Sequence, residues 1–283
     1  MALVRTADLV DAARRAGHGI PAFNVITLEH AEGIASAAER AGRGVILQLS
    51  HNAVRFHRGS VLPIARAMAA LAECAGADLA LHLDHVEDTD LLHRAADAGF
   101  SSAMYDAGAL PYRDNVSSTR QAVTWAHDAG LWLEAELGYV GGKPDAPVSA
   151  HAAGVFTDPE EAAAFVAETG VDGLAVAVGS SHAMTERTAT LDLELITRLR
   201  ERVPVPLVLH GSSGVPDDEL RAAITAGIVK VNIGTALNIA YTDAVRQGVA
   251  SGSSSDPRKY LAPAREAVAV AAAQLIDVVC GRP

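Results

Sequence analysis

The sequence predicts a single (β/α)8 barrel with an extra C-terminal helix, spanning residues 1–283 as one domain. Short apolar runs alternate with longer amphipathic, alanine-rich segments along the whole chain. Eight apolar runs can be counted, and 283 residues suffice for one barrel without a second domain. A doubly wound open sheet is the competing fold. It would need fewer strands, and no G-x-G-x-x-G motif follows the first run.

Each predicted strand is a short apolar run bounded by glycine, proline or a polar residue, as is typical of strands buried on both faces. The predicted strands are 20–24, 45–49, 79–83, 102–105, 131–136, 173–178, 206–209 and 229–233. The clearest predicted helices are 28–41, 61–75, 116–129 and 216–226. The four residues 157–160, Thr-Asp-Pro-Glu, have the pattern of a capping box at a helix start.

Two segments interrupt this alternation. Residues 138–155, after the fifth predicted strand, are rich in glycine and proline and indicate a long mobile loop. Residues 248–257 contain a run of serine and glycine, which predicts a flexible link to a last helix over 263–279. Neither segment has the composition of a domain boundary, so the single-domain prediction stands.

Composition excludes several classes of function. Lysine and arginine total 23 against 34 aspartate and glutamate, a formal charge of −11 without a basic stripe, so a nucleic-acid partner is not expected. The longest apolar stretch, 267–273, is too short to cross a membrane, and the first 16 residues lack the apolar core of a signal peptide. Two distant cysteines, Cys74 and Cys280, indicate a reducing compartment, and the predicted location is cytoplasmic.

Polar side chains stand at the end of nearly every predicted strand, where the active site of a barrel lies. They are Asn24, Ser50, Asp84, His85, Asp106, Glu136, His182, His210 and Asn232. Three neutral imidazoles on one face form a three-histidine site with an open coordination position, as in catalytic zinc sites. The alternative is that these groups only hydrogen-bond one another in the barrel mouth.

The other histidines fit an ordinary structural role better. His18, His30, His51, His57, His93, His127 and His151 fall on predicted helices or loops, where solvated surface positions are expected. Strict alternation along a strand points His82 with Asp84 and away from His85, so His82 is assigned a supporting role.

Two glycine-flanked segments predict a phosphate site. Residues 210–214 (HGSSG) follow the seventh predicted strand, and residues 232–235 (NIGT) open the helix after the eighth. The loops after strands seven and eight of a barrel commonly lead to helix N-termini that bind phosphate. Glycine also serves plain turns, but the two motifs together favour an anion site.

At these residues the chain resembles the class II, metal-dependent ketose-bisphosphate aldolases, in particular the tagatose-bisphosphate branch. The matching segments are 21–24 (PAFN), 82–85 (HLDH), 134–138 (EAELG), 177–182 (AVGSSH), 209–214 (LHGSSG), 230–235 (KVNIGT) and 256–261 (DPRKYL). They occur in the family's order along essentially the whole chain. The resemblance implies reversible aldol cleavage that yields dihydroxyacetone phosphate and an aldehyde.

The resemblance also implies roles for individual residues. His85, His182 and His210 would hold one zinc ion per chain, with Asp106 and Glu136 near a second or alternate metal position and a monovalent cation as a further candidate. Asp84 would act as the acid at the aldehyde-derived oxygen. The predicted substrate and phosphate contacts are Asn24, Ser50, Gly211, Ser212, Ser213, Asn232, Ile233, Gly234 and Thr235. Arg258 would reach the distal phosphate, often in a neighbouring subunit, which implies a homodimer or homotetramer.

The chain departs from the family pattern mainly in the predicted mobile loop. Relatives carry Gly-Gly-x-Glu there, and this glutamate moves the proton on the dihydroxyacetone carbon. Here residues 141–145 read Gly-Gly-Lys-Pro-Asp, so Pro144 takes the glutamate's place and Asp145 becomes the candidate base. Ala183 replaces a glycine after the second zinc histidine. Residues 107–109 and 51–52 also differ from the family. Together these departures indicate a changed aldehyde partner or a specialised pathway.

Two other functions are compatible with the sequence. One is an isomerase or epimerase that acts through the same enediolate, made plausible by the missing loop glutamate. The other is a sugar-phosphate-binding protein without catalysis. Asp84 discriminates against the second, because a binding module has no need of a carboxylic acid beside the metal.

Overall fold

The eight strands of the protein form one closed parallel barrel, in the order β1 to β8 along the chain. The structure is a computed structural model that describes residues 3–138, 156–252 and 255–281. The strands are β1 (Ile20–Asn24), β2 (Val45–Ser50), β3 (Leu79–Val86), β4 (Ser102–Tyr105), β5 (Trp132–Leu137), β6 (Gly173–Val176), β7 (Leu207–Leu209) and β8 (Ile228–Ile233). The barrel prediction is confirmed, and all eight predicted strands are present within a few residues of their predicted ends.

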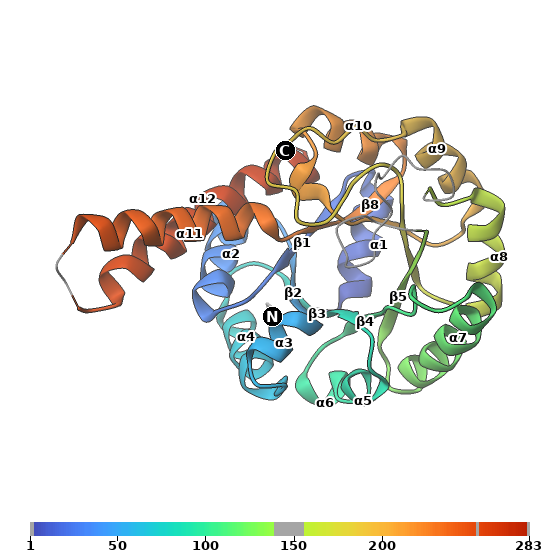
Figure 1. Cartoon of the computed structure of the whole chain (residues 1–283), viewed down its shortest axis with the longest axis horizontal. Helices are drawn as coiled ribbons and strands as arrows, with labels where there is room; N and C mark the ends of the chain where they lie inside the picture. The colour runs from blue at the N-terminus through green and yellow to red at the C-terminus, as the bar shows by residue number, and fades with distance from the viewer. Residues whose placement is uncertain (1–2, 139–155, 253–254, 282–283) are drawn as a thin grey trace.

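Most of the helices lie in an outer ring around the barrel, whereas the first lies inside the ring in this view and the last two project from it (Figure 1). In chain order, the helices are α1 (Thr6–Ala16), α2 (Leu28–Ala41), α3 (His51–Phe56), α4 (Leu62–Cys74), α5 (Thr89–Leu92), α6 (Ala95–Ala98), α7 (Tyr112–Asp128), α8 (Pro159–Thr169), α9 (Leu193–Arg202), α10 (Asp217–Ala226), α11 (Thr235–Ser251) and α12 (Arg258–Cys280). A 3-10 turn, η1 (Ser212–Gly214), follows β7. None of the helices in the described ranges is long and apolar enough to cross a membrane.

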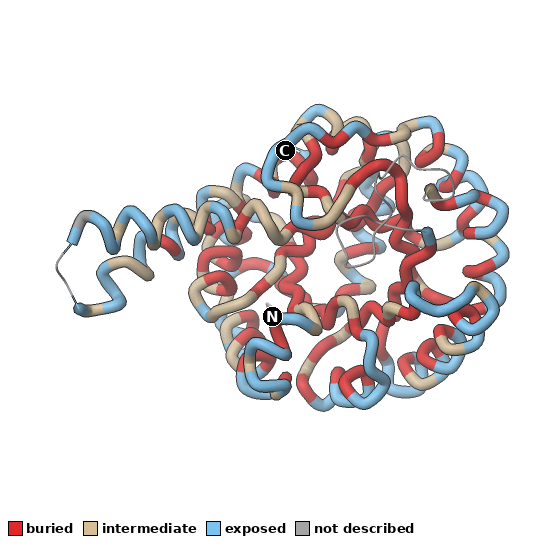
Figure 2. Tube along the Cα trace, viewed as in Figure 1, coloured by how far each residue is buried: buried red, intermediate tan, exposed pale blue. Residues whose placement is uncertain are grey.

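The apolar core has two parts. Figure 2 shows the buried residues gathered on the strands and on parts of the surrounding helices. The larger part fills the space between the strands and the outer helices and includes Phe23, Leu47 and Leu81. The smaller part lies inside the barrel, where α1 brings Val10 and Ala13 against Ile46 and neighbouring strand residues. Because α1 contributes to this inner cluster, the barrel interior is apolar at that end, and its polar residues gather toward the other.

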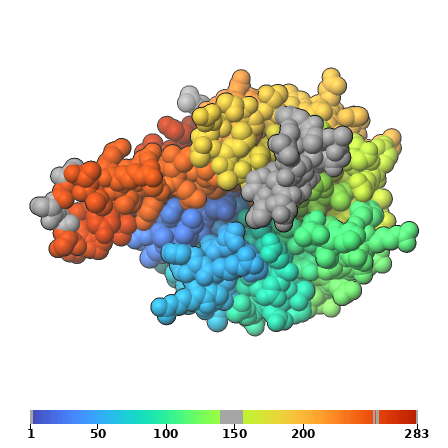
Figure 3. Space-filling view, in the orientation of Figure 1, coloured from blue at the N-terminus to red at the C-terminus, as the bar shows by residue number. Residues whose placement is uncertain are grey.

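The last two helices form a hairpin that projects from the barrel (Figures 1 and 3). The predicted flexible link 248–257 is wrong in part, because α11 continues to Ser251 and α12 already begins at Arg258. Gly248 permits this close helix contact, since a Cβ atom there would lie 2.8 Å from the Cβ atom of Tyr260. The predicted start at residue 263 is also wrong. Pro263 lies inside α12, where it forgoes one backbone hydrogen bond.

The capping box predicted at residues 157–160 takes a different form. Asp158, rather than Thr157, is the N-cap of α8, and its carboxylate accepts a hydrogen bond from the Glu161 N–H at 2.9 Å. The Thr157 hydroxyl instead donates to the Leu137 carbonyl at 2.6 Å and accepts from the Ala177 N–H at 2.8 Å. Thr157 therefore joins the ends of β5 and β6.

Candidate active site and metal centre

A bulge in β3 places Asp84 and His85 in the same pocket. The pairing of β3 with β4 passes from Leu83 opposite Ala103 to Val86 opposite Tyr105, so β3 contains one more residue than β4 over this stretch. His85 takes up the extra residue with a left-handed φ of 51°. The expectation that His85 points away from Asp84 is therefore wrong, because strict alternation fails at a bulge. Both side chains line one pocket at this end of the barrel, the main pocket, which His182 and Ser213 also line.

Three histidines from different strands converge at this end of the barrel. His85 comes from β3, His182 from the segment after β6, and His210 from the residue after β7. One ring nitrogen of each lies within 4.8 Å of the others, and the ring centroids are 4.9 to 5.6 Å apart. Nitrogens bound to one zinc ion are separated by roughly 3–4 Å, so small side-chain movements suffice for the triad to ligate a single ion.

Carboxylates fix the orientation of two of these rings. Asp106 Oδ2 lies 2.9 Å from His85 Nδ1, which leaves His85 Nε2 for a metal. Glu134 Oε1 lies 2.9 Å from His210 Nε2, and Glu136 Oε2 lies 2.9 Å from His210 Nδ1. Burial by itself would lower the pKa of His210, but the two glutamates outweigh burial and raise it to about 9. A carboxylate behind each of these ligands is the usual arrangement in protein metal sites.

A fully buried ion pair supports His210 from below. Lys230 Nζ lies 2.8 Å from Glu134 Oε2 and 2.7 Å from Asn232 Oδ1. Burial would raise the pKa of Glu134, but Lys230 and the hydrogen bond from His210 hold it well below its usual range. The site predictions do not include Glu134 and Lys230. The sequence did contain a signal for this pair, namely a charged residue inside each of two apolar strands. A buried lysine or glutamate requires a partner of opposite charge.

Asp84 is also buried in this polar interior. Gln48 Nε2 lies 3.4 Å from one of its oxygens and Asn232 Nδ2 lies 3.5 Å from the other. Burial would raise the pKa of Asp84, yet the positive charges of nearby His85 and His210 lower it. Asp84 is therefore held in its ionised form.

His82 has a structural role beside Asp84. Its Nδ1 atom lies 2.8 Å from the Ser102 hydroxyl, and its Nε2 atom lies 3.9 Å from Asp84. Burial and then the charge of Lys230 lower the pKa of His82 to about 3, so this ring stays neutral.

Two histidines of the triad, His85 and His182, line the main pocket, which has a volume of about 680 Å³. His210 is fully buried and is not part of the lining. The predicted site residues that line this pocket are Asn24, Ser50, Asp84, His85, Asp106, His182, Gly211, Ser212, Ser213, Asn232, Gly234 and Thr235. Gln48, His51, Asn52, Arg55, Glu87, Ala109, Ser181, Ala183 and Asn238 also line it and were not predicted as site residues. Arg55 is the one lysine or arginine in this described lining. The predicted base Asp145 lies outside the described residues.

The two predicted phosphate segments lie side by side and hold each other. Ser212 donates its hydroxyl proton to the Asn232 carbonyl, and the Ser213 hydroxyl accepts from the Ala236 N–H at 3.1 Å. Gly211 has φ of 66°, and a Cβ atom there would lie 2.5 Å from the Ser181 carbonyl carbon. Only glycine fits this close approach. The Ile233 side chain is buried and does not line the main pocket.

Arg258 lies away from the pocket of its own chain. It is on the projecting hairpin, its side chain is 88% exposed, and it pairs with Asp256 at 2.8 Å. This position gives Arg258 no contact with the triad in the same chain, so a role at a site would require a second subunit.

Seven histidines are expected at solvated surface positions, and this expectation fails for His30 and His51. His151 lies outside the described residues. His30 is buried on α2 and stacks on Tyr241 of α11, with ring centroids 4.4 Å apart. Its Nδ1 atom lies 3.1 Å from the Thr27 hydroxyl, which fits a structural role between α2 and α11. His51 lines the main pocket. The prediction failed for both because contacts between distant segments decide their burial.

The fold and site together define a barrel enzyme. The face at the C-terminal ends of its strands carries a histidine triad, a buried aspartate and the two glycine-flanked segments 210–214 and 232–235. The model of the class II fructose-bisphosphate aldolase family matches residues 4–282. The chain is 32% identical to the YdjI aldolase of Escherichia coli K12, covering 99% of this chain and 98% of that one, with a TM-score of 0.86.

Two further solved structures are similar. A Coccidioides immitis protein provisionally assigned as a fructose-1,6-bisphosphate aldolase is 31% identical over 98% of this chain and 97% of its own, with a TM-score of 0.87. The fructose-bisphosphate aldolase of Campylobacter jejuni is 22% identical over 100% and 97% of the two chains, and its TM-score of 0.83 shows the shared fold. The chain belongs to the class II fructose-bisphosphate aldolase family and is an aldolase, a carbon–carbon lyase.

Proposed function

We propose that this aldolase joins dihydroxyacetone phosphate to an aldehyde, and cleaves the product, with one zinc ion held by His85, His182 and His210. The observation that carries the proposal is one pocket lined by His85, His182, Asp84 and the two predicted phosphate segments, with His210 buried beside the other two histidines. Aldol chemistry needs these three parts together. Negative charge must be stabilised and a proton transferred while the substrate is held by its phosphate group.

The donor atoms fit a divalent ion of the zinc type. Imidazole nitrogens suit zinc, and three protein ligands leave a position open for substrate oxygen. Asp106 and Glu134 orient two of the rings, and Glu136 beside His210 offers an alternate ligand. When bound, the ion supplies Lewis-acid stabilisation of negative charge on the dihydroxyacetone oxygens.

Asp84 acts on the aldehyde side of the reaction. Condensation turns the aldehyde oxygen into a hydroxyl, so a proton must be delivered there, and cleavage requires the reverse. Asp84 lines the pocket beside His85 and is held by Gln48 and Asn232. A buried carboxylate in this position is suited to the proton transfer.

The phosphate of dihydroxyacetone phosphate binds at the Gly211–Ser213 segment and the start of α11. Thr235 is the first residue of this helix, and anions bind favourably at helix N-termini. The chain has no basic stripe, so local backbone N–H groups supply this recognition.

The aldehyde lies on the other side of the pocket, near α3 and the end of β3. Arg55 there pairs loosely with Glu87 at 3.4 Å, and both side chains are about 60% exposed. An exposed pair of this kind is worth about 0–1 kcal/mol, so Arg55 is available to an anionic group on the aldehyde.

Oligomer formation and a cytoplasmic location complete the proposal. The α11–α12 hairpin projects from the barrel and exposes Ile239, Val249 and Val270, which favours burial against a second copy. In such a homodimer or homotetramer, Arg258 would reach the site of a neighbouring subunit.

Replacement of one metal ligand tests the proposal. His182 is suited to this because it is half-buried, whereas His210 lies between two buried glutamates. His182→Ala is expected to lose zinc on gel filtration, keep its circular dichroism spectrum and lose aldol cleavage. His93→Ala, at the end of α5 and outside the lining of the main pocket, is the matched control and should retain zinc. Full zinc content in His182→Ala would overturn the assignment.

A further inference from the structure

The segment after β6, which carries His182, runs beside the segment after β7, which carries Gly211 to Ser213. Ser180 donates its hydroxyl proton to the His210 carbonyl at 2.6 Å. Further along, the Ala189 N–H donates to the Gly214 carbonyl at 2.9 Å. The Leu191 N–H donates to Glu219 in α10 at 2.9 Å. The two segments are therefore joined along their length, although they belong to different strands.

Arg187 makes the strongest of these connections. Its Nε and Nη2 atoms both donate to the Val215 carbonyl, at 2.9 and 2.6 Å, and Nη2 also pairs with Asp217 in the first turn of α10. The Arg187 side chain is 43% exposed, but two hydrogen bonds to one carbonyl and one to a carboxylate restrict its position. Val215 directly follows the 3-10 turn η1, so the hydrogen bonds of Arg187 fix the position of the turn at its C-terminal end.

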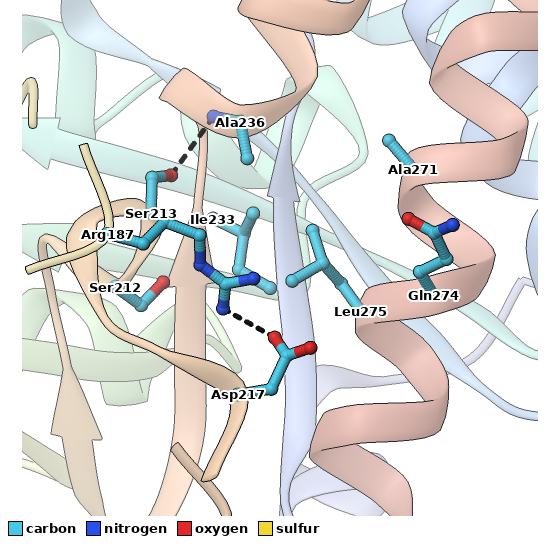
Figure 4. A pocket seen from close by; sticks show the side chains of 9 residues that line it. All are labelled: Arg187, Ser212, Ser213, Asp217, Ile233, Ala236, Ala271, Gln274 and Leu275. Carbon is cyan, nitrogen blue, oxygen red and sulfur yellow. Dashed lines mark hydrogen bonds and ion pairs between the residues drawn. The ribbon is translucent and has the colours of Figure 1, made fainter. Parts of the chain in front are cut away.

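The other side of the turn is fixed by β8 and α11. Ser212 binds the Asn232 carbonyl and Ser213 binds the Ala236 N–H. Figure 4 shows the bond from Ser213 to Ala236 and the pairing of Arg187 with Asp217. Hydrogen bonds therefore hold the turn on two sides. Those of Arg187 come from the segment after β6, and those of Asn232 and Ala236 come from β8 and α11.

Packing holds the turn only in part. Met184 contacts Gly214 closely, since a Cβ atom on Gly214 would lie 2.5 Å from the Met184 Cβ atom, but the side that Arg187 lines is less filled. A cavity of about 140 Å³ lies there, lined by Arg187, Ser212, Ser213, Ala236 and Leu275 (Figure 4). Arg187 and Asp217 line this cavity and not the main pocket. A well-packed core would keep the turn in place by itself. Beside a cavity, the turn has room to shift once its hydrogen bonds are lost.

We propose that Arg187 is a positioning residue that holds η1 in the geometry that binds the substrate phosphate. It acts from behind the turn, through the Val215 carbonyl and Asp217, without touching the substrate. This inference rests on the proposed binding of dihydroxyacetone phosphate at Gly211–Ser213. A displaced turn weakens phosphate binding first, whereas the metal ligands keep their own supports.

The test separates phosphate binding from folding and from turnover. Arg187→Met keeps the length of the side chain and removes its donors. We expect the dissociation constant for inorganic phosphate, measured by calorimetry on the zinc-loaded protein, to rise by about tenfold, equivalent to about 1.4 kcal/mol. The KM for dihydroxyacetone phosphate should rise by about the same factor. Zinc content should stay at one per chain, and kcat should change by less than KM. Arg187→Lys keeps one ammonium donor and should recover part of the affinity.

Arg198→Met is the matched control, since Arg198 is exposed on α9 and its loss makes the same charge change. It should leave the phosphate affinity unchanged. A folded Arg187→Met protein with unaltered phosphate affinity and unaltered KM would overturn the proposal, as would a loss of kcat alone. Condensation by the unaltered protein tests the proposed function separately, because phosphate calorimetry requires no turnover.

Discussion

The Nε2 atom of His210 lies 2.9 Å from the Oε1 atom of Glu134, and neither side chain is exposed to solvent. Lys230 neutralises the same glutamate from its other oxygen at 2.8 Å. His210 therefore has one ring nitrogen committed to Glu134, and its other nitrogen, Nδ1, lies 2.9 Å from Glu136. This pair sets both the tautomer and the angle of the ring.

Loss of the Glu134 charge should weaken the metal site. Glu134→Gln retains the shape but leaves Lys230 without a countercharge and His210 without a strong acceptor. We expect zinc affinity, measured by competition with a chelator, to fall by about 10- to 100-fold, the usual effect of losing such a support. Glu168→Gln, at an exposed position of α8, is the control and should bind zinc normally. Normal zinc affinity in Glu134→Gln would mean that His210 is oriented by other contacts.

Asp84 should be required for carbon–carbon cleavage but not for metal binding. Asp84→Asn keeps the size and shape of the side chain beside Gln48 and Asn232 but removes its titratable carboxyl group. We expect one zinc per chain and a kcat lower by about 10²–10⁴-fold, the scale of a positioned acid or base. Asp90→Asn, an exposed change a short distance along the chain, should have wild-type turnover. Equal turnover in both variants would assign the proton transfer to another group.

Arg55 should discriminate among aldehydes by charge. In Arg55→Met, kcat/KM for an aldehyde that carries a phosphate or carboxylate should fall by about tenfold, equivalent to 1.4 kcal/mol. The same constant for neutral glyceraldehyde should change little. The ratio of the two constants is the measurement, because it cancels any loss of active protein. A ratio equal to that of the unaltered enzyme would show that the anionic end binds elsewhere.

Ala183 stores backbone strain beside the metal centre. Its φ of 58° is left-handed, which costs a residue with a Cβ atom about 1–2 kcal/mol. Ala183→Gly should raise the free energy of unfolding by about 0.5–1 kcal/mol after the extra entropy of glycine is subtracted. Thermal unfolding measures the change. Ala164→Gly, in the exposed interior of α8, should act in the opposite direction by about 1 kcal/mol. A lower melting temperature for Ala183→Gly would contradict the strain argument.

Proton exchange on dihydroxyacetone phosphate should be slow in this enzyme. Pro144 stands where relatives carry a glutamate, and proline cannot take the proton. Deuterium uptake from heavy water, with no aldehyde present, should be slowed further by Asp145→Asn and accelerated by Pro144→Glu. Fast exchange that survives Asp145→Asn would point to a different base.

The sequence by itself determined the strand count, the parallel order and the set of polar residues at the strand ends. Apolar runs of strand length, separated by helix-length amphipathic segments, leave few other folds, because each run must be buried on both faces. Parallel strands of a barrel end on one face, so residues as distant as His85, His182 and His210 are brought together by topology alone.

Other features depended on contacts between distant segments, which one-dimensional patterns do not contain. The bulge that turns His85 toward Asp84 arises from pairing with β4, and regular alternation predicts the opposite direction. The burial of His30 depends on Tyr241 of α11. The Lys230–Glu134 pair likewise joins two separate strands, and the hydrogen bonds from Arg187 to Val215 join the segments that follow β6 and β7. Local propensity fixes the elements of this protein, whereas only three-dimensional packing decides which polar groups are buried together and what holds the turn η1 in place.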